Sequence, residues 1–144
     1  MAILMATWQF WAVLAAIFAA LTAIFAKVGV DKLGSDFATF LRTFVVLVVL
    51  GLLLALTRKF EPLRNISPRS ALFLLLSGLA TGASWLCYFR ALKLGNASQV
   101  APVDKLSVVL VAVFGVLFLG EHLSPMGWVG VALVGSGAVI MALS

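Results

Sequence analysis

Apolar stretches long enough to cross a lipid bilayer recur along the chain, and most charged residues fall in the short loops between them. A membrane-spanning helix needs about 20 predominantly apolar residues. Of the 144 residues, 64% are hydrophobic and 10% are charged, which is more apolar surface than a water-soluble domain of this size can bury. The sequence therefore predicts an all-α integral membrane protein with a single domain, residues 1–144. We expect five transmembrane helices, over residues 8–28, 37–57, 70–92, 98–119 and 126–143.

The excess of basic residues bears on the membrane rather than on nucleic acid. The net charge is +5, from ten Lys and Arg against five Asp and Glu. In a water-soluble protein this excess would suggest a nucleic-acid partner. Here the basic residues lie mainly in loops and at helix ends, where they set orientation and contact lipid headgroups. We therefore expect the lipid bilayer as a partner, and no nucleic acid.

Short local patterns predict where several helices begin and end. Ser67–Pro68 and Ser124–Pro125 each combine an N-cap serine with a first-turn proline, and we expect them to start the third and fifth helices. Gly95 follows the third helix and is expected to stop it in the left-handed conformation. Ser35 or Asp36 is expected to cap the second helix.

The fourth apolar stretch holds the two most deeply placed charges of the chain, Asp104 and Lys105. Each costs about 2.5–3.5 kcal/mol at the centre of a membrane helix, so the pair needs a reason to be there. Lys105 is expected near the bilayer midplane, where transporters place substrate sites. Adjacent residues point about 100° apart on a helix, so we expect these two charges to find separate partners. Ser107 shares the face of Asp104.

Other polar and aromatic residues lie inside the remaining stretches. Arg42 lies one to two turns inside the second helix and either snorkels to headgroups or is a buried partner for an Asp or a substrate. Hydroxyl groups form a stripe on the third helix beside Trp85; they either face a wet cavity or bond to their own backbone. We expect one cavity, lined by the Asp104 face of the fourth helix, by Trp11 and Thr22 of the first, and by Thr81, Ser84, Trp85 and Tyr88 of the third. Trp11 has the alternative role of an interfacial anchor.

The depths of these charges suggest how they are partnered. Arg42 is the nearest partner for Asp104 by depth, which would leave Lys105 as an unpaired cation close to the midplane. An unpaired lysine there favours an anionic or zwitterionic small-molecule substrate. The alternative is that Lys105 pairs with Asp104 of a second subunit or snorkels outward. We expect gating or structural roles for Pro102 and Glu121. Glu121 emerges on the membrane side of a basic loop and is expected to form an ion pair with it, through Arg58, Lys59, Arg64 or Arg69.

The last three stretches resemble the EamA-like domain of the drug/metabolite transporter superfamily. The residues that carry the resemblance are 88–95 (YFRALKLG), 101–107 (APVDKLS), 119–121 (LGE), Ser124–Pro125 and the glycine-rich last helix, with Arg42 also fitting. Typical members have ten spans built from two inverted units, whereas this chain holds one unit, as in the small five-span prokaryotic branch. The resemblance implies a multi-pass transporter of a prokaryotic plasma membrane. The first stretch lacks the glutamate that the small multidrug exporters of this superfamily carry there.

Two functional hypotheses follow. The first is a transporter protomer whose pathway forms in a homodimer, either antiparallel or parallel. The alternative is an accessory or structural membrane subunit, such as a partner of a lipid-carrier flippase. The charges of the fourth stretch and the hydroxyl stripe favour the first. With one His, one Cys and no phosphate-binding or nucleophile motif, we expect no metal, no cofactor and no enzymatic activity.

Overall fold

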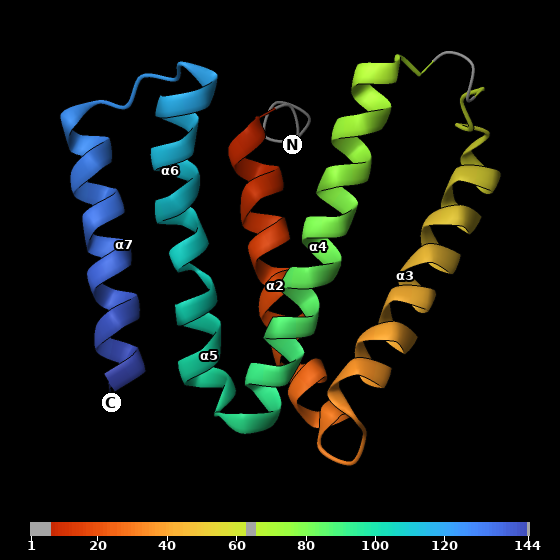
Figure 1. The fold of residues 1–144 in the computed structure, drawn as a ribbon, viewed down its shortest axis with the longest axis horizontal. Coiled ribbons are helices and arrows are strands. Elements are labelled where there is room, and N and C mark those ends of the chain that lie inside the picture. Colours follow the sequence, from red (N-terminus) through yellow and green to blue (C-terminus); the bar gives the residue numbers. More distant parts are fainter. Residues whose placement is uncertain (1–6, 63–65, 144) are drawn as a thin grey trace. The chain divides into compact units, whose positions relative to one another are not determined.

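The computed structural model describes residues 7–62 and 66–143, and all regular secondary structure within them is helical. Five helical stretches are long and apolar enough to cross a membrane, which confirms the predicted architecture. Their bounds lie within two residues of those expected, except that the fourth stretch is divided in two. The helices are α2 (Trp8–Val30), α3 (Ser35–Thr57), α4 (Pro68–Leu94), α5 (Ala97–Asp104), α6 (Leu106–Leu119) and α7 (Pro125–Leu143) (Figure 1).

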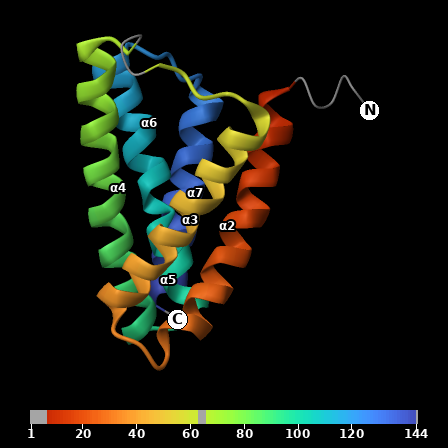
Figure 2. The same cartoon turned by 90° about the vertical axis from the view of Figure 1, so that its right-hand side faces the viewer.

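The described residues belong to two compact units. The first unit contains most of α2 together with α5, α6 and α7, and the second contains α3 and α4. Within the first unit, α5 and α6 both pack against α7, and α6 and α7 lie side by side in both ribbon views (Figures 1 and 2). The fourth and fifth spans are therefore direct neighbours.

Small residues bring α6 and α7 together. A Cβ atom added at Gly135 of α7 would lie 3.3 Å from Cγ2 of Val109 in α6, so the two helices are in close contact there. Ala138, one turn further along, is buried. Close approach at small residues is the usual way in which membrane helices associate. By contrast, nothing lies within 4 Å of a Cβ added at Gly130 or Gly137, so the glycine-rich last helix also has an open side.

The serine–proline starts are confirmed. The Ser67 hydroxyl accepts a hydrogen bond from the Ser70 amide at 3.1 Å, and α4 begins at Pro68. The Ser124 hydroxyl accepts one from the Gly127 amide at 3.1 Å. In each case the serine satisfies an amide of the first turn, and the proline occupies a position where no amide is needed.

Two other predicted caps are wrong, although α4 does end before Gly95 as expected. The N-cap of α3 is Gly34, and the Ser35 hydroxyl, inside the helix, donates to the carboxylate of Asp36. Gly95 has no positive φ; among the described residues only Arg58 and Gly120 do. The Gly95 carbonyl instead accepts a hydrogen bond from Lys27 Nζ at 2.8 Å. A lysine ammonium thus satisfies a carbonyl at the end of α4, and no left-handed turn is required there.

The fourth span breaks at Lys105, contrary to the expected continuous helix over residues 98–119. Lys105 has ψ −5°, and its amide is shared between the Ala101 carbonyl at 3.3 Å and the Pro102 carbonyl at 3.0 Å. Its own carbonyl accepts from the Val108 amide at 2.9 Å. The bonds to Pro102 and from Val108 connect residues three apart, which is the tighter 3₁₀ pattern. Pro102, inside α5, has no amide to donate to the Ser98 carbonyl, so the turn before the break is also one hydrogen bond short.

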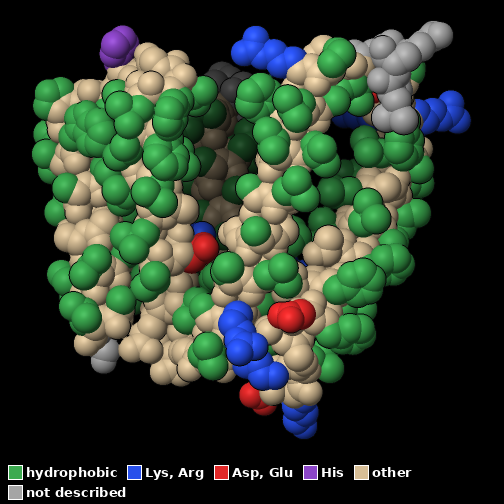
Figure 3. Space-filling model, viewed as in Figure 1, with side chains coloured by type: hydrophobic (Ala, Val, Ile, Leu, Met, Phe, Trp, Pro, Cys, Tyr) green, Lys and Arg blue, Asp and Glu red, His purple; other side chains and the backbone are tan. Residues whose placement is uncertain are grey.

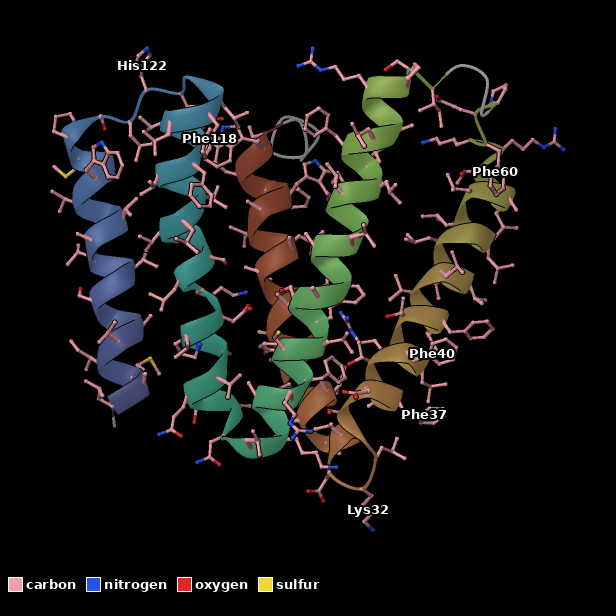
Figure 4. All side chains as sticks on the ribbon, in the orientation of Figure 1. Lys32, Phe37, Phe40, Phe60, Phe118 and His122 are labelled. Atoms are coloured by element: carbon pink, nitrogen blue, oxygen red, sulfur yellow. The ribbon has the colours of Figure 1, made fainter. Side chains whose placement is uncertain are left out.

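Apolar side chains cover the outer faces of the helices. Phe37 and Phe40, at 58% and 66% exposed, point away from the α3 ribbon (Figure 4). Hydrophobic side chains also cover the visible flank of α6 and α7 (Figure 3). An exposed apolar surface of this extent is stable in lipid and not in water.

Candidate substrate-binding residues

Asp104 and Lys105 form an ion pair at the break in the fourth span. Lys105 Nζ lies 3.0 Å from Oδ2 of Asp104, and this is the one ion pair within residues 7–62 and 66–143. The prediction that these neighbours cannot face each other, and that Lys105 is unpaired, is therefore wrong. The 100° separation holds for a continuous helix. Lys105 instead lies in a 3₁₀ turn, and its flexible four-carbon side chain reaches back to the carboxylate.

The ion pair keeps capacity for a further ligand. The side chains of Lys105 and Asp104 are 54% and 34% exposed. An ammonium group has three donors and a carboxylate can accept several hydrogen bonds, so one contact between them leaves others available. Ser107, two residues beyond the break, is also exposed. The first unit therefore presents a positive and a negative group side by side within a membrane span.

Arg42 of α3 lies on an aromatic surface. Its guanidinium carbon is 3.9 Å from the centroid of the Trp85 ring and 5.7 Å from that of Phe89, both on α4. A cation over an aromatic face is attracted by the ring quadrupole, which partly replaces an anionic partner. Within the described residues the Nη1 atom of Arg42 is buried and has no hydrogen-bond partner. The predicted pairing with Asp104 would join the two units and stays a prediction.

Phe89 was not singled out in the sequence. It lies four residues after Trp85, so the two side chains share a face of α4, and it is buried. An aromatic pair at this spacing, on a span that neighbours an arginine-bearing span in the sequence, is the signal that could have identified it.

The hydroxyl stripe of α4 is partly satisfied by its own backbone. The Thr81 hydroxyl donates to the Ser77 carbonyl at 2.8 Å, as expected for a hydroxyl inside an apolar helix. Thr81 and Ser84 are exposed, while Tyr88 is half-buried, with its ring 6.5 Å from that of Phe89. Thr81 and Ser84 are thus accessible to a ligand.

The candidate residues form two sets, one in each unit. Trp11 and Thr22 of α2 belong to the first unit with the ion pair; Trp11 is exposed and its ring meets that of Phe10 edge-on at 5.5 Å. Thr22 is half-buried. Arg42 and the α4 stripe belong to the second unit. A single cavity lined by both sets stays a prediction.

Glu121 folds back over the end of α6. Gly120 is left-handed, with φ 68°, and the Glu121 amide donates to the Gly115 carbonyl at 3.1 Å. The carboxylate Oε2 lies 2.7 Å from where a Cβ of residue 115 would stand, so Gly115 provides the space for this side chain. The predicted ion pair between Glu121 and the basic loop would join the two units. Arg64 of that loop lies outside the described residues. The ion pair therefore stays a prediction.

Comparison with known proteins identifies the family. Residues 6–143 match the EamA-like transporter family. A Sinorhizobium sp. protein named "Uncharacterized transporter in cobO 3'region" is 61% identical over 137 residues, covering 95% of this chain and 97% of that protein. An "Uncharacterized transporter" of Vibrio cholerae is 28% identical over 95 residues, covering 65% of this chain and 32% of that longer protein. No solved structure matches significantly. The resemblance drawn from the sequence is thereby confirmed: the chain is a multi-pass membrane transporter of the EamA-like family.

Proposed function

We propose that the chain is the protomer of a secondary-type transporter that moves a small anionic or zwitterionic metabolite through a pathway formed in a homodimer. The observation that carries the proposal is the Asp104–Lys105 ion pair at the break of a membrane-spanning helix. Charged residues within membrane spans are expensive and are found mainly where they serve an ion or a substrate.

The position of the pair suits a substrate site. Interrupted membrane helices are common at the substrate sites of transporters, where irregular backbone lines a cavity. A zwitterion presents a carboxylate and an ammonium group close together, and these complement Lys105 and Asp104 respectively. A simple anion would use Lys105 alone. Because Lys105 is already paired, the zwitterionic class gains support over the purely anionic one.

The five-helix unit supports a homodimer. Transporters are commonly built from two inverted repeats around a central site, and this chain holds five spans. The Sinorhizobium relative is matched over 97% of its length, so it has the same single-unit size. Gly130 and Gly137 leave an open side on α7 where a second copy can approach closely. An accessory subunit would not require an ion pair within a span, so this alternative is less well supported.

Uptake into liposomes tests the proposal. Purified wild-type protein, with no other gene product, is expected to take up a member of a panel of labelled amino acids and organic acids. Lys105→Met should lower that uptake by about 100-fold, because it removes the positive group offered to the substrate and leaves Asp104 unpaired within a membrane span. Lys105→Arg keeps the charge and should retain part of the flux. Lys32→Met is the matched control, since this lysine extends from the loop between α2 and α3 (Figure 4).

Three results would contradict the proposal. Unchanged uptake by Lys105→Met would remove the ion pair from the pathway. Uptake that requires a second protein would favour the accessory subunit. Crosslinking in transport-competent liposomes that yields only single protomers, and no dimer, would exclude the dimeric pathway.

A further inference from the structure

The guanidinium group of Arg42 has one edge nitrogen, Nη1, that makes no hydrogen bond within the described residues. The face of the group is covered, because its central carbon lies 3.9 Å from the centroid of the Trp85 ring. Its N–H donors lie in the plane of the group and point outward from its edge. The aromatic rings attract the charge but provide no strong acceptor in that plane. Within the described residues Nη1 is buried and donates no hydrogen bond.

The hydroxyl groups next to Arg42 on α3 do not fill this role. The Thr39 hydroxyl donates to the Ser35 carbonyl and the Thr43 hydroxyl donates to the Thr39 carbonyl, both at 2.8 Å. Both therefore engage the backbone of their own helix. Buried donors in proteins nearly always have an acceptor, and a charged donor without one is costly. Tyr88 of α4 also interacts electrostatically with Arg42, but within the described residues Nη1 has no hydrogen-bond acceptor.

We propose that the edge of the Arg42 guanidinium binds an oxyanion, a carboxylate or phosphate group, of the transported metabolite. This inference rests on the proposed function and deepens it, because it assigns the substrate a planar or tetrahedral oxyanion. A guanidinium edge donates two parallel hydrogen bonds to such a group, whereas a lysine ammonium is only a point charge. Trp85 and Phe89 are positioning residues: they hold the plane of the guanidinium so that its edge stays free.

The depth of Arg42 favours a small free anion over a lipid headgroup. Arg42 comes seven residues after Ser35, the first residue of α3, which is roughly 10 Å along the helix axis. Lipid phosphates lie outside the hydrocarbon core, whereas Nη1 is enclosed by protein. A diffusible oxyanion that enters when the site opens therefore fits better than a membrane lipid.

Tryptophan fluorescence offers a direct test because Trp85 contacts the guanidinium. The protein has four tryptophans, so Trp8→Phe, Trp11→Phe and Trp128→Phe together leave Trp85 as the reporter. The full chain in phosphatidylcholine nanodiscs is titrated with inorganic phosphate and with acetate, and with chloride as the ionic-strength control. A saturable change in Trp85 emission is expected with phosphate or acetate and not with chloride.

Substitutions at the site separate the guanidinium edge from its charge. Arg42→Gln should abolish the response, and Arg42→Lys, which keeps a cation, should raise the apparent Kd about tenfold because the two-pronged contact is lost. Phe89→Leu keeps Arg42 but removes one of the two rings that hold its guanidinium group, so it should also raise the apparent Kd. Arg69→Gln is the matched control, since this arginine lies exposed in the first turn of α4. Helical circular dichroism and size-exclusion profiles establish that each variant is folded.

Three outcomes would overturn the inference. They are no saturable response to either oxyanion, an equal response in Arg42→Gln, or an Arg42→Lys variant that binds phosphate as tightly as the parent. A lipid headgroup is the ligand instead if phosphatidylglycerol nanodiscs already give the shifted emission and added phosphate changes nothing further. Liposome uptake is measured separately, so a protein that transports but shows no oxyanion response disproves this inference while leaving the proposed function in place.

Discussion

At the scale of single residues, Arg58 closes α3 in a conformation that side chains other than glycine rarely adopt. Its φ and ψ are 52° and 35°, in the left-handed region. The Arg58 amide donates to the Ala55 carbonyl at 3.3 Å and the Lys59 amide donates to the Leu54 carbonyl at 3.1 Å. This is the Schellman pattern, whose left-handed position is usually glycine. The hydrogen bonds that end the helix therefore offset the strain at Arg58.

Arg58→Gly should consequently stabilise the protein by about 1 kcal/mol, because glycine adopts this conformation without a Cβ penalty. Arg58→Ala removes the same charge but retains the Cβ, so it should give no such gain. The measurement is the unfolding midpoint in detergent, followed by helical circular dichroism. Lys59→Gly is the matched control, since Lys59 has no positive φ. Equal stabilisation by Arg58→Gly and Arg58→Ala would show that charge removal, not backbone strain, is responsible.

At the scale of secondary-structure elements, the sequence predicts what local chemistry decides. The five spans follow from hydropathy, and the Ser67 and Ser124 caps follow from one residue bonding to an amide three positions on. The break at Lys105 could not be predicted in the same way, because it depends on the backbone torsion of a residue with no breaking tendency of its own. The Trp85 contact of Arg42 depends on how two helices pack, which periodicity within one helix does not determine.

The packing of α6 on α7 gives a prediction for the glycines of the last helix. Gly135→Leu should destabilise the protomer by about 1–3 kcal/mol, because a Cβ alone already lies only 3.3 Å from Cγ2 of Val109 and the rest of the leucine side chain must displace it further. Gly51→Leu in α3 is the matched control: nothing lies within 4 Å of its added Cβ, and the variant should keep its unfolding midpoint. Similar losses for both variants, measured by denaturant titration in detergent, would refute the assigned α6–α7 contact.

At the scale of the whole molecule, the distribution of basic residues bears on membrane orientation. Four of them are expected on the side of the membrane where the loop between α3 and α4 emerges: Arg58, Lys59, Arg64 and Arg69. Five belong to the other side: Lys27, Lys32, Arg42, Arg90 and Lys93. Cytoplasmic loops normally carry a clear excess of Lys and Arg, and four against five provides almost none. Two of the five also donate hydrogen bonds to residues far away in the sequence, as Lys27 donates to the Gly95 carbonyl and Lys93 donates to the Leu33 carbonyl.

We therefore expect the chain to insert in both orientations and to form an antiparallel homodimer, which would recreate the inverted repeat of ten-span relatives. Fusing the C-terminus to a reporter active only in the cytoplasm, and separately to one active only outside it, should give signal in both cases. Signal from one compartment alone would exclude dual orientation and leave a parallel dimer. The sequence defines the charge balance behind this prediction, but the arrangement of two copies depends on surfaces that no single-chain pattern specifies.

The ion pair of the fourth span also has a consequence for biosynthesis. Because Asp104 and Lys105 are adjacent in the chain, their contact needs no other helix and can form as soon as this turn is made. Pairing lowers the cost of bringing both charges into hydrocarbon. Arg42 differs, since its aromatic partners on α4 are synthesised later. The fourth span can thus leave the translocon as an electrically neutral segment, whereas the second must carry its charge until the third arrives.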